Sequence, residues 1–159
     1  MKKSLIFLAA ISLVVLLNSC GGGNTYKNDA FKYSVTLPEG FVPQNQDAAM
    51  EAERGGKLFV KEGCMIDMTA KKMDYKYITA EESLKQSFEI AKALNNDVIS
   101  SELKDDHYVI KYQDQFGYRV GYEMQKNGVS LNIFITYPVE KKAEFDKDVD
   151  AVLSSATIE

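Results

Sequence analysis

The chain has 159 residues, of which 45% are apolar and 26% charged, with 19 basic and 23 acidic side chains and a formal net charge of -4. This composition is that of one globular domain of ordinary size, and it excludes a disordered, collagenous or repeat protein. It also argues against a nucleic-acid partner, since nucleic-acid binding requires clustered positive charge.

The first twenty residues have the features of an export signal. Lys2 and Lys3 form a short positive start, and the thirteen residues from Leu5 to Leu17 include one polar side chain, Ser12. As a helix this segment would rise about 20 Å, which is short of the roughly 30 Å hydrocarbon core of a membrane. The pattern therefore predicts a signal peptide over residues 1–19 rather than a membrane span.

The end of this segment reads Leu17-Asn18-Ser19-Cys20 and resembles the lipobox of bacterial lipoproteins. An aliphatic residue stands three before the cysteine and a small one directly before it, while Asn18 differs from the small or β-branched residue usual there. The resemblance implies cleavage before Cys20, diacylglycerol on its thiol and acylation of its freed amine. Two or three acyl chains hold a protein on a bilayer almost permanently. The alternative is a plain secretory peptide with an incidental cysteine.

The resemblance also implies a location. Gly21, in place of Asp, is similar to lipoproteins sent to the outer membrane, so we expect the bacterial cell envelope, lipid-anchored on the periplasmic face of the outer membrane. Residues 20–26 are predicted to be the lipidated cysteine and a flexible tether, and 27–159 the folded domain. An acidic domain gains nothing from anionic lipid, so the acyl chains on Cys20 are expected to be the only membrane anchor. Cys64, the remaining thiol, is expected to be buried in a strand.

The first half of the domain shows the patterns of strands. Apolar and polar residues alternate over 31–37, which predicts a half-buried strand that ends at Pro38-Glu39-Gly40 and follows a short strand around Tyr26. Residues 48–53 and 57–61 flank Arg54-Gly55-Gly56 and are predicted to form a hairpin. A further strand is predicted over 64–71.

The spacing of the apolar residues then changes from that of a strand to that of a helix. Thr79 and Glu82 fit a capping box, and the apolar positions of the next turns predict a helix over 80–94 with Leu84, Phe88, Ala91 and Leu94 on one face. Asn95-Asn96 is expected to end it, because asparagine tolerates the left-handed conformation.

The last third alternates again and then returns to the helical period. Strands are predicted over 98–103, 107–113, 119–126 and 129–137, with a type I′ turn at Asn127-Gly128, and a final helix over about 141–154. Tight turns cannot join parallel strands. The fold class is therefore α+β, an antiparallel β-sheet packed with two main helices.

One motif in this pattern resembles a known family. The run from Phe31 to Phe41 reads FKYSVTLPEGF and is similar to the opening strand of PsbP-like proteins, and the order of the later elements follows that family. The resemblance covers about residues 26–159 and implies an α/β/α sandwich. Members of this broad fold generally act as binding or assembly factors. No functional residue is carried over, and a fold does not determine a function.

Few residues carry the chemistry of a catalytic or metal site. Asp105-Asp106-His107 is the one cluster of metal-ligand type, and an Asp-rich turn accounts for it. A single histidine excludes a histidine-rich zinc site. Glu81-Glu82 is expected to favour the helix dipole rather than acid–base catalysis. We therefore predict no catalytic residue, no metal ligand and no cofactor.

Four tyrosines suggest a contact surface, since tyrosine is enriched at interfaces. They are Tyr75, Tyr77, Tyr118 and Tyr122, of which Tyr122 is expected in the sheet core. The sequence thus predicts a non-enzymatic, membrane-anchored envelope lipoprotein that binds a protein partner or assists an assembly. The alternative is a small-molecule or lipid-binding lipoprotein with a cleft between helix 80–94 and the sheet, and an enzyme stands third.

Overall fold

The computed structural model describes residues 23–159, so the predicted signal peptide and Cys20 lie outside the described residues. Along the described chain the elements are β1 (Gly23–Asn28), β2 (Tyr33–Pro38), β3 (Val42–Pro43), α1 (Ala48–Arg54), β4 (Leu58–Lys61), β5 (Cys64–Lys72), α2 (Ala80–Leu94), β6 (Val98–Leu103), β7 (His107–Asp114), β8 (Gly117–Lys126), β9 (Val129–Tyr137), the 3-10 helix η1 (Val139–Lys141), α3 (Lys142–Ser155) and β10 (Thr157–Ile158).

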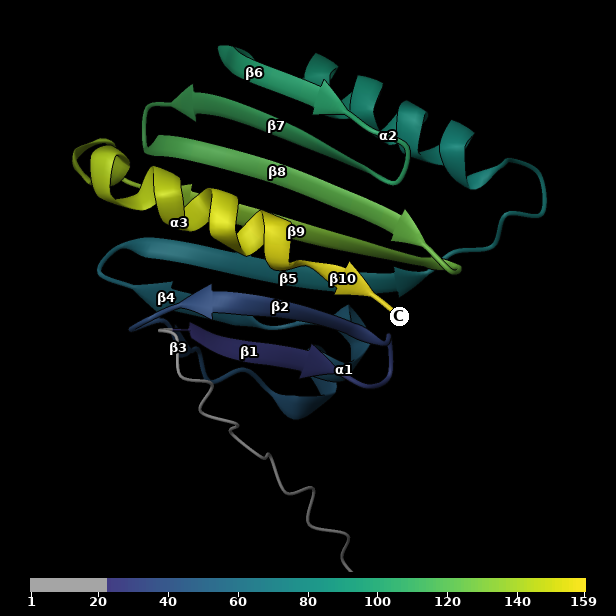
Figure 1. Ribbon diagram of the computed structural model, residues 1–159, viewed down its shortest axis with the longest axis horizontal. Helices are drawn as coiled ribbons and strands as arrows, with labels where there is room; N and C mark the ends of the chain where they lie inside the picture. The colour runs from purple at the N-terminus through teal and green to yellow at the C-terminus, as the bar shows by residue number, and fades with distance from the viewer. Residues whose placement is uncertain (1–22) are drawn as a thin grey trace, which may run out of the picture.

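The strands form two antiparallel sheets rather than one. The larger has seven strands in the order β3-β4-β5-β9-β8-β7-β6, and the smaller has the order β1-β2-β10. The small sheet and α3 lie against one face of the large sheet, and α2 lies against part of its other face (Figure 1). The predicted α+β class, with an antiparallel sheet between helical layers, is confirmed.

The main core fills the space between the large sheet and the layer of α3 and the small sheet. Strict alternation along β9 turns its apolar side chains to this core, and α3 supplies the opposing ones. The alternation of the sequence predicts Val129, Leu131, Ile133, Ile135 and Tyr137 on one side of β9, and the helical period predicts Phe145, Val149, Val152 and Leu153 on the inner face of α3. All are buried except Val129, which is partly buried against the core. At the turn before β9, Asn127 and Gly128 have φ of 51° and 74°, as a type I′ turn requires.

A smaller core lies on the opposite face, where Leu84 and Phe88 of α2 pack on Tyr108 and Ile110 of β7. The predicted capping box starts this helix. The Glu82 N–H donates to Thr79 Oγ1 at 3.1 Å, and the Thr79 N–H donates to Glu82 Oε2 at 2.9 Å. The hydrogen bonds that the Thr79 N–H and hydroxyl donate to the Glu82 carboxylate lower the pKa of Glu82. No helix within residues 23–159 has the length and apolarity to cross a membrane.

The end of α2 differs from the prediction in two details. Leu94 is 77% exposed rather than packed. Asn95 is extended, with φ of -108°, and its side chain donates to the Ala91 carbonyl at 2.6 Å. The left-handed residue is Asp97, with φ of 57°. The side-chain bond of Asn95 satisfies a terminal carbonyl and removes the need for a left-handed cap at that position.

The predicted hairpin over residues 48–61 is wrong in its first arm, which is the helix α1. Asp47 caps this helix, because its side chain accepts from the Ala49 N–H at 2.8 Å. Gly55 ends it with φ of 64°, and a Cβ there would lie 2.3 Å from the Ala70 carbonyl oxygen. Gly55 and Gly56, which we expected in the turn of a hairpin, therefore follow the end of a helix instead. The second predicted arm, residues 57–61, corresponds to the strand β4.

The ends of the described chain hold one strand that the sequence predicted in part and one that it did not. The short strand predicted around Tyr26 is confirmed as β1, but it begins at Gly23 and so includes residues 23–26, which were expected in a tether. It pairs with β2 from Gly23 opposite Pro38 to Asn28 opposite Tyr33. After α3, Thr157 and Ile158 form β10 on the other side of β2. These pairings form the small sheet, whereas the sequence predicted a single sheet.

Candidate binding groove and edge strand

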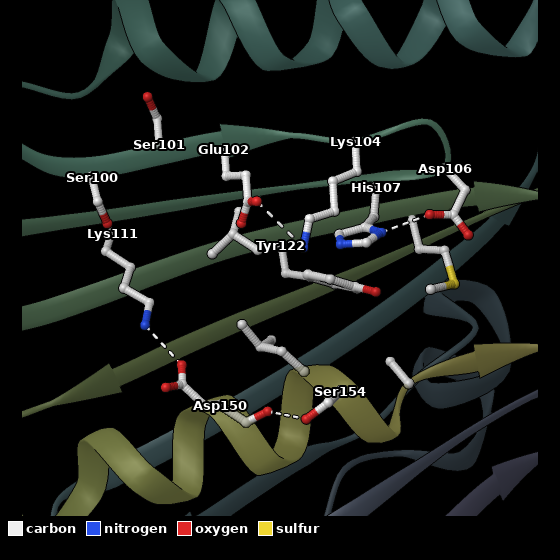
Figure 2. A pocket seen from close by; sticks show the side chains of 14 residues that line it. Ser100, Ser101, Glu102, Lys104, Asp106, His107, Lys111, Tyr122, Asp150 and Ser154 are labelled. Carbon is white, nitrogen blue, oxygen red and sulfur yellow. Dashed lines mark hydrogen bonds and ion pairs between the residues drawn. The ribbon is translucent and has the colours of Figure 1, made fainter.

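A groove of about 500 Å³ opens on the α3 face of the large sheet, between α3 and the strands β6 and β7 (Figure 2). Its floor includes Val109, Tyr122 and Met124 from β7 and β8, and polar side chains surround the floor. The sequence placed a cleft beside helix 80–94 instead. That location is wrong, because Leu84 and Phe88 of α2 pack closely on β7 there.

Two lysine–carboxylate ion pairs and one histidine–carboxylate pair surround this floor. Lys111 of β7 meets Asp150 of α3 at 2.8 Å, and Lys104 meets Glu102 at 3.3 Å. In the third pair, Nδ1 of His107 lies 2.6 Å from Oδ1 of Asp106. Figure 2 shows the first pair reaching from strand to helix and the other two along the β6–β7 side. Both lysines therefore have a carboxylate partner, and the groove suits a polar ligand that can exchange these contacts.

His107 and Tyr122 form the most enclosed part of the groove. Their rings lie 5.4 Å apart, and Tyr122 is 4% exposed. Burial, with the nearby charge of Asp106, raises the pKa of the Tyr122 hydroxyl well above its ordinary value. The phenol thus stays neutral near pH 7 and can exchange hydrogen bonds with a bound group.

The predicted turn is confirmed at Asp105-Asp106, which lie between β6 and β7, and His107 is the first residue of β7. Within residues 23–159 no group of three His, Cys, Asp or Glu side chains has the geometry to hold a metal ion. Glu81 and Glu82 stand in the first turn of α2, with Glu82 engaged in the cap.

Beside the groove, β6 forms one edge of the large sheet, and all six of its residues are exposed. The Lys104 N–H donates to the His107 carbonyl at 2.8 Å. Because backbone groups alternate along an antiparallel strand, the N–H and C=O of Ser101 and Leu103 point away from β7. A register shift between Val98 and Ser100 is the one irregularity of this edge. Neither Lys nor Pro interrupts the strand, so an added strand can pair with it.

The opposite face of β8 holds a buried polar cluster that the sequence did not reveal. Glu123 accepts from Gln125 Nε2 at 2.6 Å and from Ser130 Oγ at 2.8 Å, and these three residues are at most 5% exposed. Tyr75, before α2, donates to Gln125 Oε1 at 3.2 Å. Burial and the charge of Glu123 raise the pKa of the neighbouring Tyr108. No sequence pattern marked this cluster, and the segment around Tyr75, which bonds to Gln125, contributes to its burial.

The four tyrosines considered as one contact surface do not come together. Tyr118 stacks on Tyr137 at 5.5 Å at the start of β8, whereas Tyr75 bonds to Gln125 near the end of that strand. Tyr77 is 88% exposed, and Tyr122 belongs to the core, as expected. We grouped the four residues because tyrosine is enriched at interfaces, but in the folded chain Tyr118 and Tyr75 lie near opposite ends of β8.

Cys64 is 4% exposed and has a free thiol, so its predicted burial is confirmed. Burial raises the pKa of this thiol, which disfavours the reactive thiolate.

Comparison with known proteins gives a fold relative. No family model matches the chain, and no curated protein does. The solution structure of cyanobacterial PsbP (CyanoP) from Synechocystis sp. PCC 6803 is similar to it, with a TM-score of 0.61, 13% sequence identity, and coverage of 90% of this chain and 99% of that chain. This likeness supports a PsbP-like domain and, at that identity, concerns the fold alone.

Proposed function

We propose that this chain is a lipid-anchored bacterial envelope protein that binds a protein partner without catalysing a reaction. The observation that carries the proposal is the exposed edge strand β6 beside the charged groove. An extended segment of the partner pairs with β6, and its alternate side chains reach into the groove over Tyr122. Main-chain hydrogen bonds between the partner segment and β6 then provide the affinity, and the ion pairs of the groove determine which side chains of the partner bind there.

The ion pairs support binding rather than catalysis. Lys111 and Lys104 each face a carboxylate, at 2.8 and 3.3 Å, so the lysine charges of the groove are matched within it. A partner segment with one positive and one negative side chain can exchange with these pairs without leaving a charge unmatched.

The edge can be tested with two substitutions at one position. Ser101→Pro removes a backbone N–H that points away from β7, so it blocks strand addition while preserving the bonds between β6 and β7. Ser101→Ala keeps that N–H and serves as the matched control. With a photo-crosslinking residue at Leu103 in cells, we expect Ser101→Ala to retain the crosslinked partner and Ser101→Pro to lose it. Equal crosslinking by both folded variants would contradict the proposal.

The anchor can be tested separately. Cys20→Ala is expected to move the protein from the membrane to the soluble fraction, and the mass of the mature wild-type chain should include acyl groups on Cys20. Membrane retention of Cys20→Ala, or a mature chain without acyl groups, would contradict the lipid anchor while leaving the role of β6 open to its own test.

The volume of the groove favours a second candidate function. A space of about 500 Å³ with an apolar floor at Val109, Tyr122 and Met124 has the size of a small-molecule site. In that case the ligand lies between α3 and the sheet, and Tyr122→Ala abolishes its binding while Ser101→Pro does not. An enzymatic activity lost on changing one polar groove residue, with the fold intact, would contradict both functions.

A further inference from the structure

Four turns gather at the end of the domain where β1 begins (Figure 1). We call this the anchor end and define it by residues 38–42, 62–63, 114–117 and 138–141. Gly23 pairs with Pro38, and Lys141 meets Glu62 at 2.8 Å. Gly63 and Gly117 both approach Pro138. These contacts place the four turns side by side with the first residue of β1.

Each of three turns at this end exposes an apolar side chain. Phe116 is 72% exposed, Val42 56% and Val139 51%. Isolated exposed apolar residues are common, but these three stand on separate segments that the contacts above bring to one end. Solvent exposure of these side chains is unfavourable, so an apolar surface that covers this end of the domain would stabilise them.

The length of chain before β1 indicates what that surface is. Gly21 and Gly22 alone separate Cys20 from Gly23, so Gly23 lies at most about 11 Å from the lipidated residue. The ten residues of β8 span roughly 30 Å, so the far end of the large sheet is beyond the reach of this link. A lipid anchor at Cys20 therefore brings the anchor end, rather than the opposite end, to the bilayer.

The remaining choice is between an end-on and a side-on orientation. A side-on arrangement would press the outer strand β1 on the membrane, and β1 exposes Asn24, Thr25 and Lys27, which are polar. The end-on arrangement brings Phe116, Val42 and Val139 to the lipid instead. Burial of apolar rather than polar groups favours the end-on orientation.

The charges at the anchor end require no particular headgroup. Lys141 is paired with Glu62 and Glu144, and Arg119 with Asp114 at 2.6 Å. Since these cations are already matched by carboxylates, anionic lipid adds little attraction.

We infer that the anchor end is a membrane-docking tip, whose Phe116, Val42 and Val139 side chains insert into the interfacial region of the bilayer and hold the domain upright. This inference rests on the proposed lipid anchor. It leaves β6 and the groove on the sides of the upright domain, where a partner can reach them.

The sequence contains no tryptophan, which permits single-tryptophan variants of the full lipoprotein. Phe116→Trp places the probe at the tip. Tyr77→Trp is the matched control, because Tyr77 is also strongly exposed, at 88%, but lies far from the tip. Its segment is placed at the other end of β8 by the hydrogen bond from the Met73 N–H to the Gly128 carbonyl. Both proteins are reconstituted in phosphatidylcholine vesicles whose acyl chains carry bromine, which quenches tryptophan within the bilayer.

For a tip inserted about 5–10 Å into the interface, we expect quenching at position 116 to be at least about threefold greater than at position 77. Adding phosphatidylglycerol or raising the salt concentration should leave this ratio unchanged. The mass of the same preparation reports the acyl chains. Equal quenching of the two probes on an acylated protein would contradict the membrane-docking tip and leave the proposed lipid anchor standing. A preparation without acyl chains would contradict the lipid anchor and, with it, the membrane-docking tip.

Discussion

Lys111 of β7 and Asp150 of α3 meet at 2.8 Å and join the sheet to the helix across the groove. Asp150 is 70% exposed at its side chain, so water screens the pair and its contribution to stability is small. Both side chains line the groove. In the proposed function this pair takes part in selecting what the groove binds rather than in holding the fold together.

Replacing Asp150 should separate these roles. We predict that Asp150→Ala lowers the free energy of unfolding by less than about 1 kcal/mol, because exposed ion pairs contribute little. Asp146→Ala on the same helix is the comparison. Asp146 accepts from Tyr137 Oη at 2.8 Å, so its loss should cost about 1–3 kcal/mol. Urea unfolding measures both, and a larger loss for Asp150→Ala than for Asp146→Ala would contradict this assignment.

Buried tyrosines predict a fall in stability at alkaline pH. Burial raises the pKa of Tyr33, Tyr108, Tyr122 and Tyr137 above the value of about 10 in an unfolded chain. Above that pH the unfolded state loses protons that the folded state retains, so stability is fully present below about pH 10 and decreases as the pH rises beyond it.

This fall can be assigned to particular residues by urea unfolding between pH 8 and 11. Tyr122→Phe removes one such group and should reduce the slope, while Tyr77→Phe, at an exposed tyrosine, should leave it unchanged. An identical slope in all three proteins would show that buried tyrosines do not cause the effect.

The polar cluster at Glu123 should be sensitive to the loss of one donor. We predict that Ser130→Ala lowers the free energy of unfolding by about 1–3 kcal/mol, because the buried Glu123 carboxylate then lacks the bond from Ser130 Oγ. Ser101→Ala, at an exposed serine of β6, is expected to change it by less than about 0.5 kcal/mol. Similar values for the two serines would indicate that water replaces the missing donor.

Cys64 should be protected from thiol reagents in the folded protein. In the Cys20→Ala chain it is the one remaining thiol, so labelling is unambiguous. Because the side chain is buried and its pKa is raised, we expect modification to be at least about 100-fold slower than in urea. Absorbance after addition of a chromogenic disulfide measures the rate. Rapid modification without urea would mean that this part of the core opens readily.

Local patterns predicted the elements that one segment determines by itself. The alternation of β9, the positive φ values at Asn127 and Gly128, and the cap at Thr79 depend on residues close in sequence. The helix α1 was missed because Gly55 and Gly56 are equally typical of a hairpin. Its determinants, the Asp47 cap and the space limit at Gly55, become clear only when β5 lies beside it.

The groove illustrates a different limit. Alternation along β7 assigns its side chains to the two faces of the sheet, but it does not indicate how completely a helix covers each face. The packing of α2 on Tyr108 fills one face, whereas α3 stops short of β6 on the other and leaves the groove. Contacts between segments far apart in sequence decide such openings, and the burial of Glu123 depends on Tyr75 in the same way.

In the proposed lipid-anchored protein, the direction of β1 determines how the domain resists being pulled from the membrane. β1 starts at the anchor end and runs away from it, paired with β2 at six positions, and β2 is held on its other side by β10 (Figure 1). A force on the domain directed away from the membrane would act along the strand axis and load those six positions together, in shear. The small sheet is therefore the element that would bear the mechanical load if a bound partner pulled on the domain.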